Sequence, residues 1–204
     1  MEKPNLLVLV ADKNMEFTLR GALPRIAALN EPKIDCTIIQ HPERDSGVRV
    51  TGPDVLARGR SKYSHALLVL DYEGSGFHGT ATELENDLDR RLADTWEDNR
   101  GKAIVIEPEV DVWMWGSDNA LAVILGRPGD QGIRDWLRQR GSEFSEQDKP
   151  LRPKEALEAL VEELRQPRSS SIYQKIAGRI SLNRCTDPAY RRLHQRLEGW
   201  FPPR

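Results

Sequence analysis

Carboxylates follow a short apolar run near the middle of the chain, and they are the residues best suited to chemistry. Residues 66–70 lead directly into Asp71 and, two positions later, Glu73, and glycines follow at positions 74 and 76. An apolar stretch this short, closed by glycine, is typical of a parallel strand that is buried on both faces. On an extended backbone Asp71 and Glu73 would point the same way, and their charges would repel unless a cation lay between them.

Acidic residues also follow two other apolar runs. Asp12 comes after residues 6–10, and Glu16 lies one helical turn later. Three more carboxylates follow the run at residues 102–106: Glu107, Glu109 and Asp111. Because the carboxyl ends of parallel strands open into one crevice, we expect these groups to converge on one rim of the sheet. Oxygen ligands without His or Cys partners favour a hard cation, so the predicted cofactor is Mg²⁺ or Mn²⁺.

Strand-like and helix-like patterns alternate through the first part of the chain. We expect strands at residues 6–10, 35–40, 66–70 and 102–106. We expect helices that begin at Asp12 or Asn14, at residues 54–60 and at residues 81–96, with a turn at residues 45–47. This alternation predicts an α/β fold with a mostly parallel sheet flanked by helices.

The rest of the chain is expected to be helical. Apolar residues at helical spacing and capping residues mark helices near residues 119–125, 133–140, 153–164, 169–180 and 187–200. We therefore expect an α/β domain over residues 1–125 and a helical C-terminal extension over residues 126–204 packed on it.

The net charge also differs between residues 1–125 and residues 126–204. The net charge is −2, but residues 1–125 hold 14 Lys/Arg against 21 Asp/Glu, a net −7, and residues 126–204 hold 16 against 11, a net +5. The basic part could face a phosphate backbone, and the candidate contacts are Arg165, Arg168, Lys175 and Arg179. The alternative is that these are solvated arginines and lysines on ordinary helix surfaces.

The cysteine content and the hydropathy of the sequence indicate the cellular compartment of the protein. Two cysteines give no framework of disulfides, and no apolar run approaches membrane-spanning length. The first residues lack a cationic leader with a long apolar segment behind it. We expect a cytoplasmic protein with no membrane partner.

The residues at the ends of two expected strands resemble the motifs of the Toprim domain. This domain occurs in topoisomerases, primases and overcoming-lysogenization-defect nucleases. The corresponding segments are LLVLVADKNME (residues 6–16) and LVLDYEG (residues 68–74). The chain is more closely similar to an uncharacterised bacterial Toprim-like family found among anti-phage defence genes, including methylation-associated clusters. That likeness rests on four motifs: HPERDSG (41–47), EPEVDVW (107–113), RPKEA (152–156) and WFP (200–202).

The resemblance implies a site and an activity. In Toprim proteins an acidic residue after the first strand and an Asp-x-Asp pair after the third hold Mg²⁺ for chemistry at phosphodiesters. Carried over, the metal ligands are Asp12, Glu16, Asp71 and Glu73, and the catalytic residues are Asp12, Glu16 and Asp71. This chain departs from the family in two places. It has Ala11-Asp12 where the family has Glu-Gly, so either Asp12 or Glu16 takes the first acidic position, and it has Asp-Tyr-Glu for Asp-x-Asp.

Three functions stay open at this point. The first is a Mg²⁺-dependent protein that binds or hydrolyses nucleic acid in anti-phage defence, together with other defence proteins. The second is a non-catalytic subunit that docks onto a nuclease or helicase partner. The third is a small-molecule phosphatase or nucleotide-binding module that uses the same rim of the sheet.

Overall fold

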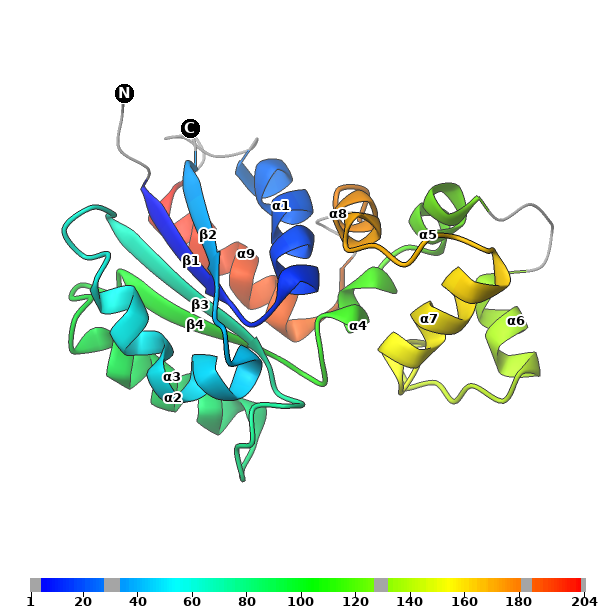
Figure 1. Ribbon diagram of the computed structural model, residues 1–204, viewed down its shortest axis with the longest axis horizontal. Coiled ribbons are helices and arrows are strands. Elements are labelled where there is room, and N and C mark those ends of the chain that lie inside the picture. Colours follow the sequence, from blue (N-terminus) through cyan, green and yellow to red (C-terminus); the bar gives the residue numbers. More distant parts are fainter. Residues whose placement is uncertain (1–4, 28–33, 127–131, 181–184, 203–204) are drawn as a thin grey trace.

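A sheet of four parallel strands forms the centre of the protein (Figure 1). The computed structural model describes residues 5–27, 34–126, 132–180 and 185–202. The strands are β1 (Leu6–Val10), β2 (Cys36–Gln40), β3 (His65–Asp71) and β4 (Gly101–Ile106), in the order β2-β1-β3-β4. Leu9 of β1 lies in register with Ile39 on one side and Leu68 on the other. Because all four strands run the same way, their carboxyl ends share one edge, and the predicted α/β fold is confirmed.

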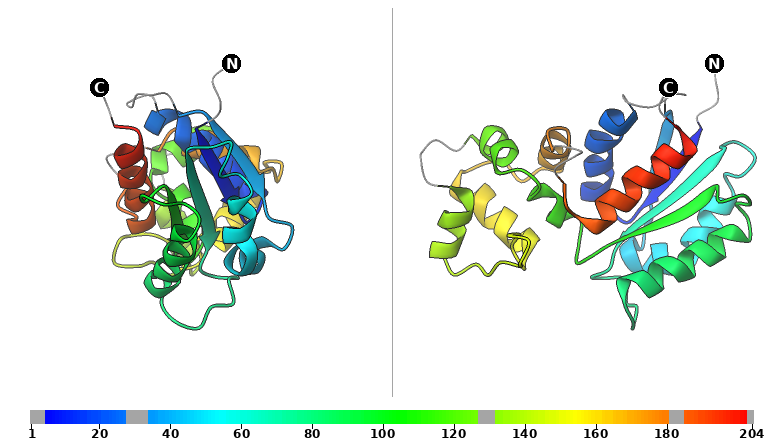
Figure 2. Two further views of the ribbon diagram at one scale, coloured as in Figure 1. Left: turned by 90° about the vertical axis from the view of Figure 1, so that its left-hand side faces the viewer. Right: turned by 180° about the vertical axis from the view of Figure 1, so that it is seen from behind.

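Helices cover both faces of this sheet (Figures 1 and 2). On one face lie α1 (Lys13–Ala27) and α9 (Pro188–Trp200), and on the other lie α2 (Arg44–Ala57) and α3 (Ala81–Ala93). The residues of β1 and the interior of β3 are accordingly buried from end to end. This two-sided burial is why these strands are continuous apolar runs instead of alternating ones.

The other described helices lie together beyond the carboxyl edge of the sheet (Figure 1). They are α4 (Asp111–Met114), α5 (Asp118–Leu125), α6 (Ile133–Gln139), α7 (Pro153–Glu163) and α8 (Ser171–Ala177). Helix α8 packs against α1, and the chain then returns to the sheet, where α9 packs on β4. The division at residue 125 into two domains stays a prediction. No helix within the described ranges is long and apolar enough to cross a membrane.

The segment at residues 45–47 is helical, and the predicted turn there is wrong. Helix α2 begins at Arg44, so the helix expected at 54–60 is only its final part. The Asp-Ser-Gly triplet at these positions suggested a turn, but the glycines of α2 allow close packing. A Cβ atom on Gly47 would lie 2.3 Å from the His41 ring, and one on Gly52 would lie 2.7 Å from the Leu68 side chain.

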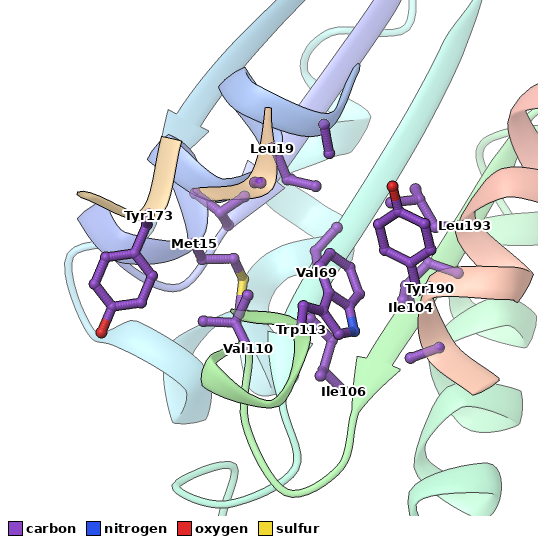
Figure 3. Packing of buried hydrophobic residues seen from close by; sticks show 14 of the residues in the cluster. Met15, Leu19, Val69, Ile104, Ile106, Val110, Trp113, Tyr173, Tyr190 and Leu193 are labelled. Carbon is purple, nitrogen blue, oxygen red and sulfur yellow. The ribbon is translucent and has the colours of Figure 1, made fainter. Parts of the chain in front are cut away.

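Two tryptophans fix the short helix α4 at the end of β4. The Trp113 indole nitrogen donates to Asp187 Oδ1 at 2.9 Å, and its ring meets the edge of Tyr190 of α9 at 5.1 Å between centroids (Figure 3). The Trp115 indole nitrogen donates to the Pro153 carbonyl at the start of α7, at 3.1 Å. Helix α4 is therefore tied to both α9 and α7.

Candidate functional site

Asp71, the last residue of β3, joins three segments at the carboxyl edge of the sheet. Its Oδ1 accepts a hydrogen bond from the backbone N–H of Val110, at 2.8 Å. Its own backbone N–H donates to Asp45 Oδ1 in the first turn of α2, also at 2.8 Å. The connections after β2, β3 and β4 therefore meet at this residue.

Two further aspartates come from neighbouring helix starts. Asp12 caps α1, because its Oδ1 accepts from the backbone N–H of Met15 at 2.9 Å. Asp111 opens α4, is buried, and its Oδ1 accepts from the Tyr173 hydroxyl of α8 at 2.6 Å. Tyr173 is thus brought to the strand ends from a helix that lies far along the chain.

We call Asp12, Asp45, Asp71 and Asp111 the aspartate quartet. In each, a hydrogen bond holds Oδ1. The Oδ2 atoms of Asp12 and Asp71 have no hydrogen bond or ion pair within the part of the chain that the structure describes, whereas the carboxylates of Asp45 and Asp111 also receive a hydrogen bond from their own backbone N–H. Each carboxylate is therefore fixed in place, and Asp12 and Asp71 each retain one oxygen for a ligand.

Burial and repulsion between carboxylates raise the pKa values of Asp45, Asp71 and Asp111. Burial raises the pKa of Asp71 well above its ordinary range, and the other three carboxylates raise it further. Burial likewise raises the pKa of Asp45 and of Asp111, with Asp12 adding to both shifts. The Tyr173 hydrogen bond opposes the shift at Asp111 without cancelling it. Full ionisation of the quartet is therefore unfavourable unless a cation neutralises it.

A glutamate and a lysine border the quartet. Lys154 of α7 places Nζ 3.8 Å from Glu109 Oε2. Burial, reinforced by Asp111, raises the pKa of Glu109 to about 7, and Lys154 opposes this shift. Burial alone would lower the pKa of Lys154, but the nearby carboxylates, Glu109 first among them, outweigh it and raise that pKa. Lys154 therefore carries a positive charge at the edge of the acidic cluster.

The other two predicted ligands lie apart from the quartet. Glu16 accepts a hydrogen bond from Arg20 Nε at 2.7 Å and another from the Gln40 side chain, so both of its oxygens are engaged. Burial would raise the pKa of Glu16, but these two hydrogen bonds outweigh it and lower that pKa. Glu73 is exposed in a turn beyond the end of β3, so the spacing of an extended strand does not align it with Asp71. Asp12 and Asp71 are the two predicted site residues that the structure brings together.

Sequence reasoning did not single out Asp45, Tyr173 or Lys154. Asp45 fell in the segment predicted as a turn. Lys154 belongs to the RPKEA motif, which is the one sequence signal that pointed to its segment. No local pattern marks Tyr173, because only tertiary packing carries it to Asp111.

The donor chemistry of the quartet fits a hard divalent cation, since all its atoms are oxygens. The side chains do not form a finished ligand shell. Within the described ranges, no group of three or more His, Cys, Asp or Glu side chains is arranged to hold a metal ion.

The protein thus has an α/β fold of four parallel strands flanked by helices, consistent with a Toprim-like fold. The solved structure of the C-terminal region of the Burkholderia pseudomallei OLD protein superposes on 98% of this chain and 99% of that one, with a TM-score of 0.50 and 10% sequence identity. At this identity the likeness is one of fold. Neither a protein-family model nor a curated protein matches the sequence.

Proposed function

We propose that this protein binds Mg²⁺ or Mn²⁺ at the aspartate quartet and acts on phosphodiester bonds of nucleic acid. The observation that carries the proposal is the quartet itself: four carboxylates at the strand ends, each with Oδ1 held by a hydrogen bond from another residue. Such a cluster costs stability in the absence of a cation, and its position is where open α/β sheets bind ligands.

Each residue has a distinct proposed role. Asp12, Asp71 and Asp111 would hold the metal after their side chains close around it, since they do not form a ligand shell as they stand. A bound divalent cation would stabilise negative charge that develops on a phosphate. Asp45 is a positioning residue, because it holds the backbone of Asp71. Lys154 would donate from its ammonium group to a phosphate oxygen. Glu16 could become a ligand only by leaving Arg20 and Gln40.

The biological setting is part of the proposal. The motifs shared with the Toprim-like defence family support a role in bacterial anti-phage defence, and the fold of the OLD protein region agrees with it. Nucleic acid and other defence-system proteins are then the expected partners.

A second candidate is a non-catalytic subunit that docks onto a nuclease or helicase. The observation that favours it is the position of Glu16 and Glu73 outside the quartet, which leaves the family's metal site incomplete. In this alternative the aspartate quartet is what remains of a metal site that no longer supports catalysis.

Calorimetry with Mn²⁺ tests the metal site. Asp71→Asn keeps the oxygen that accepts from Val110 but removes the charge, so we expect affinity to fall at least about tenfold. Asp12→Asn should behave the same, because asparagine caps a helix as well as aspartate does. Asp54→Asn, at an exposed position of α2, is the matched control. Equal affinity in all four proteins would refute the site.

Cleavage assays separate the two candidates. Single- and double-stranded DNA and RNA are incubated with Mn²⁺ and either the wild type or Asp71→Asn. We expect the variant to lose about a hundredfold or more in rate. A wild type that binds Mn²⁺ but cleaves nothing, alone or with its genomic neighbours, would favour the docking subunit.

A further inference from the structure

A cavity of about 230 Å³ lies beside the aspartate quartet, and we call it the side hollow. Its walls include Leu157, Val161, Ile172 and Tyr173, with Asn14 and Arg168 among the polar residues that line it. Drug-sized ligands fill pockets of about 300–1,000 Å³, so the side hollow suits one flat ring system instead of a larger molecule. Its apolar side chains favour an aromatic ring, because the face of such a ring gains by leaving water.

Tyr173 connects the side hollow to the quartet. Its side chain lines the hollow, and its hydroxyl donates to Asp111 at 2.6 Å. Figure 3 shows the hydroxyl end of Tyr173 directed away from the side chains of Met15 and Leu19. Asn14, which accepts from Ser170 Oγ at 2.7 Å, lines the hollow two residues after Asp12. The Tyr173 side chain therefore spans from the side hollow to Asp111 of the quartet.

Cationic side chains line both the side hollow and a neighbouring groove that contains Asp12. A groove of about 570 Å³ at the ends of β1 and β2 is lined by Asp12, Asn14, Lys13 and Arg44, so it meets the side hollow at Asn14. Arg168, which lines the side hollow, is exposed, and its guanidinium has no hydrogen-bond or ion-pair partner in the described part of the chain. A polyanion that runs from the groove past Asn14 to the side hollow would meet cations in the groove and another at the hollow.

From this arrangement we infer that the side hollow binds one unpaired nucleobase of the strand whose phosphate lies at the aspartate quartet. Tyr173 supplies the aromatic surface, and Arg168 contacts an adjacent phosphate. The inference rests on the proposed function, since it takes nucleic acid as the ligand. It adds that the ligand is single-stranded DNA or RNA, because a paired base cannot enter the hollow. Glu158, which also lines it, can accept a hydrogen bond from a base amino or imino group.

Filling the side hollow tests the inference. Glu158→Trp places a large ring at the hollow from an exposed position of α7, and Glu162→Trp is the control, with the same charge change at an exposed position one turn along that helix. Binding of short fluorescent DNA and RNA oligonucleotides is measured with Ca²⁺ in place of Mg²⁺ or Mn²⁺, so that a cation still neutralises the quartet, and gel electrophoresis confirms that the oligonucleotides stay intact. We expect Glu158→Trp to weaken single-strand binding about tenfold and Glu162→Trp to leave it unchanged.

Abasic oligonucleotides provide a second measurement that depends on no variant folding. Removing a single base, position by position, should weaken binding to the wild type about tenfold at one position. That loss should vanish in Glu158→Trp, because the base has nowhere to enter. Equal binding by Glu158→Trp and Glu162→Trp, or an abasic scan with no sensitive position, would overturn the side hollow alone. A wild type that binds no oligonucleotide would overturn the proposed function as well.

Discussion

The pH dependence of stability should change when Glu109 is replaced by glutamine. Burial raises the pKa of Glu109 from 4.5 to about 7 in the folded protein. A carboxyl group whose pKa is raised on folding stabilises the fold while it is protonated. Its contribution is therefore complete below 4.5 and is lost as the pH rises through about 7. Glu109→Gln removes this titration and keeps the shape of the side chain.

The size of the effect follows from the shift. One pKa unit corresponds to about 1.36 kcal/mol, so the complete shift would cost about 3 kcal/mol at high pH. Most of this loss of stability falls between about pH 5 and about pH 8. The Lys154 side chain is 52% exposed, so solvent screens part of its interaction with Glu109. We expect the wild type to lose about 2 kcal/mol more than Glu109→Gln across this interval.

Urea unfolding followed by tryptophan fluorescence at a series of pH values measures this difference. EDTA keeps metal ions out, and Glu162→Gln, at an exposed position of α7, serves as the control with the wild-type slope. Parallel stability curves for the wild type and Glu109→Gln would refute the reasoning. So would a wild type that gains stability relative to the variant as the pH rises.

Three further substitutions probe the strand ends and their support. Asp71→Asn should raise the melting temperature in EDTA and abolish stabilisation by Mg²⁺, which for the wild type reaches about 2.7 kcal/mol at a hundred times Kd; a variant that Mg²⁺ still stabilises fully would count against the site. Tyr173→Phe leaves Asp111 without its donor and should cost about 1.5–3 kcal/mol in urea unfolding, whereas no loss would mean that the hydrogen bond is absent in solution. Asp187→Ala leaves Lys149 buried without its 3.3 Å partner and should cost about 3–5 kcal/mol; a loss below about 1 kcal/mol would show that Lys149 finds another partner.

The strands were predictable because burial on two faces leaves a plain signal. The run at residues 6–10 matches β1 residue for residue. Strands β2 and β4 differ from expectation by one residue at one end, and β3 is longer by one residue at each end. Only the last part of helix α2 was predicted, and its first part was missed for a physical reason. Gly47 and Gly52 weaken helix propensity locally, but they allow the close packing that stabilises the helix in the fold.

The candidate site was only partly predictable. Strand ends of parallel sheets converge by topology, so the meeting of Asp12 and Asp71 follows from the alternation of strands and helices. The side-chain environment does not follow from topology. Glu16 lies one turn after Asp12, yet its pairing with Arg20 depends on rotamers and on Gln40 of the neighbouring strand, which the sequence does not specify.

The cost of the aspartate quartet is itself an argument for a ligand. Two of its members have structural duties, since Asp12 caps α1 and Asp45 holds the backbone of Asp71, but asparagine could perform both without a charge. The pKa values of Asp45, Asp71 and Asp111 are raised by burial and by neighbouring carboxylates, so ionising these groups destabilises the fold at neutral pH, and Lys154 offsets only part of the repulsion at Asp111. Lys154 and Tyr173 reach the quartet from α7 and α8. The helices beyond residue 125 therefore help to build the same acidic centre that the sheet begins, and a cation there would stabilise contacts between the two parts of the chain.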